Sequence, residues 1–334
     1  MRKIIKNIFI LLLPVSIVSF LIFSYNVIKL DFQFAHQSAH VYQPPFAWQK
    51  YLLLSELQDF YKKITENQKK TNLPKTEVYI GEQSLKKLLS NLPNSTKEWV
   101  KAYVNNPEYK LQEIELRYRG DNPDNWLKSK KSFRIKTKKS QVINGYRNID
   151  YFPFSTETFV PYLISKEMDL LNKEVELLEV YFNGESKGLY YAAPKLNEMF
   201  LRKNNLMPVN IYKGENHAAE FHIGLNKNLF NNPSLWSKSA FFNQENAESK
   251  NDLKKFFKVL GSNQNKPDPS LDGYIDLDYF SKFDAFLTLT SNVHHDWFHN
   301  MRLILDPWSG KVTQLIVDPS IIPLSNLKIL NNIT

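Results

Sequence analysis

One long apolar run lies near the start of the sequence. Residues 8–25, IFILLLPVSIVSFLIFSY, carry no charged side chain, whereas Arg2, Lys3 and Lys6 precede them. At about 1.5 Å per residue, a helix of this length comes close to crossing a hydrocarbon core of roughly 30 Å. Because basic residues stay on the cytoplasmic side, the pattern predicts one membrane anchor with the remaining chain outside the cytoplasm. The alternative is a cleaved signal peptide, for which residues 35–39 offer only a weak cleavage site.

After the apolar run, a polar and aromatic connector leads to a second helical pattern. Residues 48–67 carry apolar side chains at spacings near three and four, which form a single stripe on a helix. Residues 76–80 then predict a strand, and residues 82–92 predict a short helix that Pro93 ends. The first helix is expected to pack against the domain that follows.

The middle of the chain alternates apolar and polar side chains, which is typical of half-buried strands. Residues 111–118 and 131–138 predict two such strands, joined by a basic loop that contains Gly120 and Pro123. Residues 159–171 then predict a helix. Strands therefore surround a helix in this part of the sequence.

Two hairpins are predicted in the second half of the chain. Residues 175–194 contain Asn183-Gly184 between two strongly β-prone arms, which favours a tight turn. A predicted helix at residues 279–293 is followed by the polar cluster HHDWFHN and by strands at residues 301–305 and 311–317. The whole pattern predicts the α+β class.

Composition narrows the possible functions. With 334 residues, of which 43% are hydrophobic, the chain can bury the core of one large or two small domains. It has no cysteine, which excludes a thiol nucleophile, a disulfide framework and a cysteine-ligated metal. The net charge of +9 favours an acidic partner, but the predicted orientation and the lack of a nucleic-acid-binding motif argue against nucleic acid. Residues 226–269, rich in Asn, Ser and Lys, are interpreted as an insertion or mobile loop.

Four polar residues fall where predicted strands or helices end. Lys136 lies on a strand after the basic loop, Asp296 and Asn300 follow a helix, and Asp318 ends the last strand. Phosphoryl transfer needs a cation for the phosphates, a carboxylate to accept the hydroxyl proton, and oxygen ligands for Mg²⁺. The order of these residues is that of a protein kinase.

The sequence also resembles the spore-coat protein H (CotH) kinase-like family, atypical kinases that phosphorylate secreted or surface proteins. LRYRGD followed by KKSFRIK, at residues 116–136, is similar to the basic loop and lysine strand of that family. Residues 175–201 resemble its pattern VELYVNGEYxGLYLLxEKIDxxFL, and residues 294–319 resemble NHDSYxxNYRLYxDPxTGKxxFIPWDxD. The resemblance extends from about Thr76 to Ser320.

The resemblance implies a two-lobed, protein-kinase-like α+β fold. A β-rich N-lobe is expected at residues 76–194 and a mixed C-lobe at residues 195–334. Residues 1–29 would form the cytoplasmic stub and membrane anchor, and residues 30–75 the connector and amphipathic helix. Because family members extend well beyond the position of Asp318, the chain is interpreted as a truncated or degenerate member.

The same resemblance implies the roles of individual residues. Lys136 would pair with the phosphates of ATP, and Asp296 would be the catalytic acid. Asn300 and Asp318 would hold Mg²⁺ or Mn²⁺. Two residues of the basic loop, Arg119 and Lys131, would help to steer phosphate. The expected partners are the membrane, through the single N-terminal helix, and a secreted or surface protein substrate.

Some positions depart from the family pattern. Ser320 replaces the second carboxylate of the Trp-Asp-x-Asp motif, a loss that weakens Mg²⁺ binding without necessarily abolishing it. Pro194 stands where the family often has Glu and lacks the N–H that could serve adenine. Asn300 follows Asp296 by four residues instead of five. An inactive pseudokinase, or a binding module for a surface protein or an anionic cell-wall polymer, therefore remains the alternative to an active kinase.

The spacing of His295 and His299 would place both imidazoles on one face of a helix, an arrangement that can bind metal. The glutamate of an HExxH motif does not accompany them. Histidines beside a catalytic acid can instead orient it by hydrogen bonding. Both interpretations stay open at this point.

Overall fold

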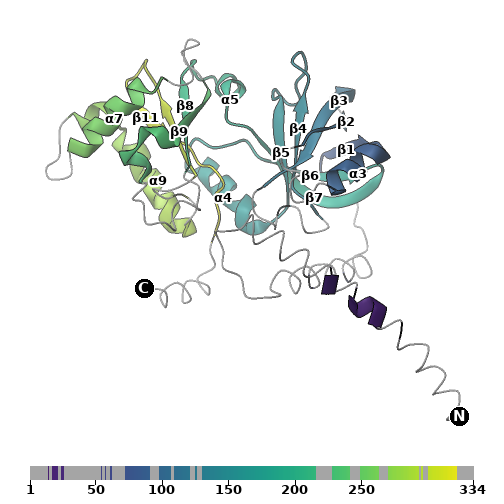
Figure 1. The fold of residues 1–334 in the computed structure, drawn as a ribbon. Coiled ribbons are helices and arrows are strands. Elements are labelled where there is room, and N and C mark those ends of the chain that lie inside the picture. The colour runs from purple at the N-terminus through teal and green to yellow at the C-terminus, as the bar shows by residue number, and fades with distance from the viewer. Residues whose placement is uncertain are drawn as a thin grey trace, which may run out of the picture. The chain divides into compact units, whose positions relative to one another are not determined.

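The structure is a computed structural model, shown in Figure 1. It describes residues 72–90, 98–106, 109–120, 125, 130–215, 228–240, 249–262, 270–292, 295 and 300–321, with scattered helical positions between residues 14 and 61. The chain divides into two compact units, Met1–Lys70 with Asn122–Ser129, and Thr71–Asp121 with Lys130–Thr334. All elements discussed below belong to the second unit.

The predicted N-terminal helices fall mostly outside this description. Residues 8–25 and 48–67 are described only at scattered helical positions. Within the described part of the chain, no helix combines the length and the apolar character needed to cross a membrane. The anchor and the amphipathic helix stay predictions.

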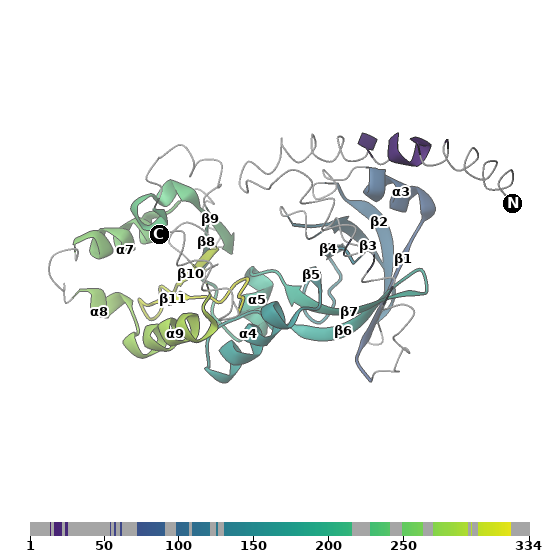
Figure 2. The same ribbon diagram turned by 90° about the horizontal axis from the view of Figure 1, so that it is seen from below.

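The first part of the second unit is a β-barrel, seen from below in Figure 2. Among the described residues, its strands follow the order β1-β2-β3-β4-β5-β7-β6. Neighbours pair antiparallel, except that β1 and β6 pair in parallel and close the barrel. The strands are β1 (Lys75–Ile80), β2 (Val100–Asn106), β3 (Tyr109–Tyr118), β4 (Phe133–Thr137), β5 (Asn148–Pro153), β6 (Glu176–Phe182) and β7 (Glu185–Pro194).

Side-chain alternation in β4 separates the barrel interior from its outer face. Phe133 and Ile135 are fully buried, and the Phe133 ring stacks on Tyr151 of β5 with centroids 4.6 Å apart. Arg134 and Lys136 point the other way, because successive side chains of a strand lie on opposite faces. The outer face of β4 is therefore cationic.

The turn between β6 and β7 confirms the predicted hairpin. Asn183 and Gly184 have φ angles of 50° and 83°, the pair of left-handed residues that a type I′ turn requires. The Asn183 side chain also accepts a hydrogen bond from Ile80 N at 2.8 Å and donates one to Ile80 O at 3.0 Å. The hairpin turn is thereby attached to the end of β1.

Gly188 of β7 provides room for a lysine of the basic loop. Its φ is +79°, and a Cβ there would lie 2.9 Å from Lys130 Nζ. The lysine can move, but the left-handed backbone costs a residue with a side chain about 1–2 kcal/mol. We expect Gly188→Ala to lower the free energy of unfolding by that amount in urea denaturation. Gly81→Ala, where a Cβ meets nothing within 4 Å, is the matched control, and equal losses in both variants would contradict the expectation.

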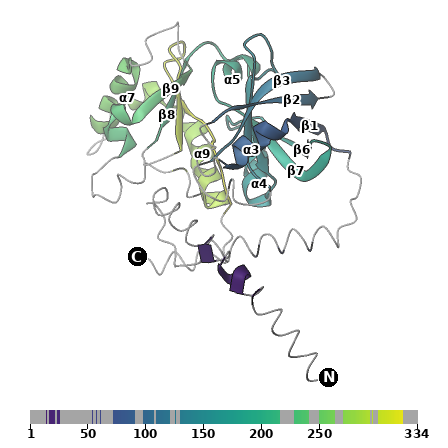
Figure 3. The same cartoon turned by 45° about the vertical axis from the view of Figure 1, so that its right-hand side comes forward.

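The helices predicted at residues 82–92, 159–171 and 279–293 are present in the structure as α3, α4 and α9. α3 spans Glu82–Ser90 and α4 spans Thr156–Glu167, close to the predicted helices. α9 spans Leu277–Thr290 and lies beside α4 (Figure 3). Tyr162 of α4 and Phe283 and Phe286 of α9 belong to one buried cluster with Tyr191 of β7.

A second, four-stranded sheet has the order β11-β10-β8-β9. β11 is shorter than the predicted strand at residues 311–317, because Ile316 leaves the sheet and pairs in parallel with Asn172. The predicted mixed α+β class is confirmed, as a seven-stranded barrel with a second sheet. The remaining elements are α5 (Glu198–Lys203), β8 (Asn210–Gly214), η3 (Leu229–Asn231), η4 (Pro233–Leu235), β9 (Trp236–Ala240), α7 (Asn251–Ser262), α8 (Leu271–Tyr274), β10 (Met301–Leu305) and β11 (Val312–Gln314).

Residues 226–269 were interpreted as an insertion or mobile loop, and the mobile loop is wrong for residues 228–240 and 249–262, which contain η3, η4, β9 and α7. Trp236 is 1% exposed, and it packs with Phe257 of α7 in the core of the second sheet. A Cβ on Gly214 would lie 2.9 Å from the Trp236 ring, so β8 approaches the indole closely. The average polarity of the segment reflects its exposed residues. It gave no sign of the apolar residues that pack in the core.

Candidate functional site

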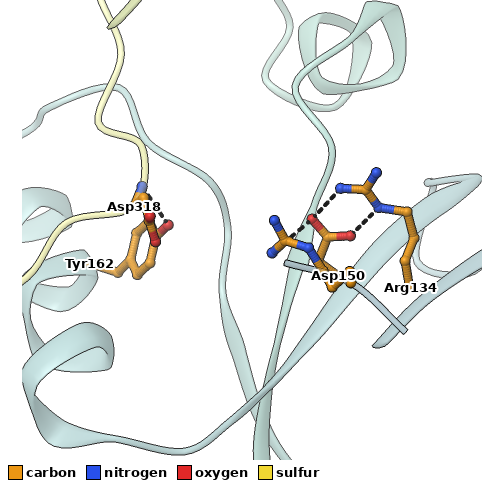
Figure 4. A network of polar contacts seen from close by, with 5 residues as sticks. Arg134, Asp150, Tyr162 and Asp318 are labelled. Atoms are coloured by element: carbon orange, nitrogen blue, oxygen red, sulfur yellow. Dashed lines mark hydrogen bonds and ion pairs between the residues drawn. The ribbon is translucent and has the colours of Figure 1, made fainter. Parts of the chain in front are cut away.

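A buried ion-pair cluster occupies the outer face of β4 and β5 (Figure 4). Asp150 of β5 is 2% exposed and faces Arg134 across the two strands. Arg134 donates hydrogen bonds from Nη2 to Asp150 Oδ2, at 2.8 Å, and from Nε to Asp150 Oδ1. Arg119 Nη1 lies 3.4 Å from Asp150 Oδ2. Burial alone would raise the pKa of Asp150, but the charges of Arg119 and Arg134 outweigh it and hold this pKa well below its usual range. The carboxylate therefore stays ionised.

Asp318 lies four residues after the end of β11, and hydrogen bonds fix the backbone there. It has a φ of 50°, a left-handed conformation that Asp tolerates better than most residues. Its N–H donates to Tyr162 Oη of α4 at 3.2 Å, and the preceding N–H, of Val317, donates to His295 Nε2 at 3.0 Å. Because burial raises the pKa of Tyr162, that hydroxyl stays protonated. The Asp318 side chain is exposed and can reach a ligand.

Two more cations face the same region. Burial lowers the pKa of Arg302 in β10 to about 10, against the opposing charges of Glu215 and Asp318. Its Nη2 lies 3.8 Å from Glu215 Oε2. Burial lowers the pKa of Lys173, in the linker between α4 and β6, to about 8, although the charges of Asp150 and Asp318 act in the opposite direction. Arg302 and Lys173 thus add positive charge to the region of the two aspartates.

The predicted phosphate contacts lie in different surroundings. Arg119 belongs to the Asp150 cluster, with its guanidinium 4.4 Å from the centroid of the Phe152 ring. Lys136 instead pairs with Glu115 on β3, Nζ to Oε2 at 2.7 Å, and its side chain is 38% exposed. Lys131 precedes β4, and its carbonyl oxygen accepts a hydrogen bond from the Tyr190 hydroxyl at 3.4 Å.

The two predicted metal ligands flank the hairpin of β10 and β11 along the chain. Asp296 is outside the described residues. Asn300 comes directly before β10, is half-buried and has a φ of 59°. Beyond the paired strands, Leu315 N donates to Arg302 O at 2.9 Å, so the register of the hairpin continues toward Asn300 and Asp318.

The donor set suits a hard cation only in part. Asn300 and Asp318 supply oxygen atoms, and Mg²⁺ commonly takes one or two carboxylates together with substrate phosphates. Among the residues that the structure describes, no cluster of three or more His, Cys, Asp or Glu side chains could hold a metal. Of the proposed histidine pair, His295 receives the Val317 N–H, and His299 lies outside the description. Asn300 and Asp318 supply oxygen donors of the kind that Mg²⁺ takes, and a metal site at these two residues stays a prediction.

Sequence reasoning missed four members of this region: Arg134, Asp150, Lys173 and Arg302. Arg134 lies inside the KKSFRIK segment, in which Lys136 on the same strand face was predicted to be the functional cation. Asp150 lies in NIDYFP, a strand that was not predicted. Their pairing depends on the register of β4 and β5, which no local pattern encodes.

Comparison with known proteins gives a family match over a range that contains these residues. A family model described as CotH kinase protein matches residues 116–318, more than half of the 334 residues. The matched range begins in β3, includes the Asp150 cluster and ends at Asp318. A search of curated proteins gave no match to this chain.

Proposed function

The chain belongs to the CotH kinase protein family, and on this basis we propose that it is a kinase that transfers the γ-phosphate of ATP to hydroxyl groups of a secreted or surface protein. The observation that carries the proposal is the placement of Asp318. It ends the family match and has an exposed side chain, and its N–H and that of Val317 donate hydrogen bonds to Tyr162 and His295 in two other segments. In this proposal the barrel is the N-lobe, and the second sheet with α9 is the C-lobe.

The residues have distinct roles in the proposed reaction. Asp296 accepts the proton of the attacking hydroxyl, a role that a carboxylate fills in protein kinases. Arg119, Lys131 and Lys136 contact or steer the phosphates. Bound Mg²⁺ or Mn²⁺ would neutralise charge on the transferred phosphoryl group, and Asn300 and Asp318 would hold it.

The proposed location follows from the sequence. Residues 8–25 would anchor the chain by a single helix, and the basic N-terminus would remain in the cytoplasm. The kinase domain would then meet its protein substrate outside the cytoplasm.

A second candidate is an inactive pseudokinase or binding module that docks a surface protein or an anionic cell-wall polymer. Two positions favour it. Ser320 replaces the second carboxylate of the metal motif, and Pro194, at the end of β7, has no N–H to offer adenine. Nucleotide binding and phosphoryl transfer separate the two candidates.

The test uses the full-length protein in detergent, titrated with ATP with and without Mg²⁺. We expect a metal-dependent rise in melting temperature, because a ligand that binds only the folded state stabilises it. Asp318→Asn should weaken Mg-ATP binding by on the order of 10- to 100-fold, the loss typical when even a residue that supports a metal ligand is removed.

The matched control is Asp284→Asn, the same change at an exposed position of α9. It should bind Mg-ATP like the wild type. Phosphoryl transfer is followed by intact mass of the protein and by ADP release. ATP binding without transfer would support the pseudokinase, and no binding at millimolar ATP would support the binding module.

A further inference from the structure

The linker between α4 and β6 is held in place by hydrogen bonds at Leu171, two residues before Lys173. Leu171 N donates to the Tyr279 hydroxyl of α9 at 3.1 Å, and Leu171 O accepts from Ile316 N at 2.9 Å. The Tyr279 hydroxyl in turn donates to Gln314 O of β11 at 2.6 Å. The backbone that carries Lys173 is therefore fixed to α9 and to the segment after β11.

The linker also runs beside the segment that carries Asp318. Asn172 pairs with Ile316 in parallel, so the following residues, Lys173 and Val317, lie at the same level of the two segments. Asp318 comes next. Because both segments are paired at this point, Lys173 is placed beside the proposed metal ligand by backbone geometry.

Lys173 interacts with the charges of Asp150 and Asp318 but forms an ion pair with neither of them. Asp150 already accepts hydrogen bonds from Arg134 and lies within ion-pair distance of Arg119. Lys173 is only partly exposed, and no carboxylate of the described residues forms an ion pair with its ammonium group. A partly buried cation without a paired anion is costly, and an anionic ligand would relieve that cost.

A cavity gives such a ligand access to Lys173. It has a volume of about 680 Å³, within the usual range of roughly 300–1,000 Å³ for ligand sites. Tyr162, which holds Asp318, lines it together with Lys173. Two further lysines, Lys166 and Lys203, also line the cavity, against two glutamates. The basic side chains favour an anion over a cation.

We propose that Lys173 binds a phosphoryl group, carried by a nucleotide or by an inorganic polyphosphate, in the cavity that this lysine lines. A compact ammonium group suits this role as a point charge for phosphate oxygens. The inference builds on the phosphate ligand of the proposed function, but it assigns a residue that no comparison of this chain identifies. It also places a phosphate-binding lysine on the α4–β6 linker, in addition to Lys136, the proposed phosphate contact on β4.

The test compares Lys173→Met, Lys136→Met and Lys138→Met in the full-length protein. Calorimetry measures the binding of Mg-ATP, of inorganic tripolyphosphate with Mg²⁺, and of adenosine. Lys173→Met should weaken ATP and tripolyphosphate binding at least about tenfold while leaving adenosine unchanged, and Lys173→Arg should restore part of the loss. Lys138, whose side chain is 58% exposed and paired with Glu113, should tolerate the same change with less than about a twofold effect.

The outcomes separate this inference from the proposed kinase function. Tripolyphosphate binding that depends on Lys173, without ATP binding, would support the phosphoryl site and count against the kinase. ATP binding that Lys173→Met leaves intact would overturn the inference and leave the kinase standing. If the wild-type protein binds neither ligand, both fail. Circular dichroism melting of Lys173→Met should show native stability, because the variant removes a cation that lacks a protein partner among the described residues.

Discussion

Asp150→Asn is expected to lower the free energy of unfolding by about 3–5 kcal/mol, the cost typical of breaking a buried ion pair from one side. The substitution leaves Arg134 and Arg119, whose side chains are 15% and 24% exposed, facing a neutral amide. Urea denaturation of the full-length protein, in one detergent throughout, measures the loss. The control is Glu115→Gln, which makes the same change opposite Lys136 on the exposed part of the barrel and should cost less than about 1 kcal/mol.

The stability difference between the wild type and Asp150→Asn is expected to depend on pH. The pKa of Asp150 is lower in the folded chain than the unfolded value of about 3.9. Its charge therefore stabilises the fold fully above the unfolded pKa, and this contribution is lost as the pH falls through the folded pKa. The stability difference between wild type and Asp150→Asn should stay constant near neutral pH and shrink below about pH 4. A difference that grows on acidification would refute the assignment.

Trp236→Ala is expected to cost about 3–5 kcal/mol, the range for removing a large aromatic side chain from a core. The indole is 1% exposed, donates Nε1 to Leu229 O at 2.8 Å, and lies 5.7 Å from Phe257 and 6.0 Å from Phe230 between ring centroids. Its removal leaves a cavity and one hydrogen bond fewer at Leu229 O, which still accepts from Asn232 N at 3.3 Å. Urea denaturation, followed by circular dichroism, gives the change in unfolding free energy.

Trp308→Ala is the matched control for Trp236→Ala. Trp308 is 59% exposed in the turn between β10 and β11, and its indole reaches Pro208 O only at 3.5 Å. Its loss should change the unfolding free energy by less than about 1 kcal/mol. If both tryptophan variants lost equal stability, the second sheet would not have the core described for it.

Local chemistry made some elements predictable from sequence. The Asn183-Gly184 turn was predicted because a type I′ turn needs two residues that tolerate positive φ, and both adopt it. The alternation in β4 likewise predicted its buried and exposed faces. These features depend only on residues next to each other in the chain.

The ion-pair cluster depends on contacts that the sequence does not reveal locally. Arg134 and Asp150 are partners because β4 and β5 pair in one register. The same register logic on the other side of β4 places Lys136 opposite Glu115 of β3. Sequence reasoning identified a cationic strand, but the neighbouring strands decide which of its two cations is buried against an acid and which is half-exposed.

The polar composition of residues 226–269 led to a wrong prediction of a mobile loop for a related reason. Asn, Ser and Lys dominate the segment, although Leu253 and Phe256 of α7 are buried in the second core. A few apolar residues at helical spacing suffice when another sheet supplies the rest of the core. Average polarity therefore describes the solvent side of such a segment and not its packing.

Hydrogen bonds of the Tyr279 and Tyr162 hydroxyls restrict the relative movement of the segments that they join. Tyr279 joins Leu171 to Gln314, and Tyr162 joins α4 to Asp318, so hydrogen bonds cross between these segments at two separate points. Segments linked twice cannot slide or rotate independently without breaking one of the links. A displacement of α4 would therefore strain the hydrogen bond that the Asp318 N–H donates to Tyr162.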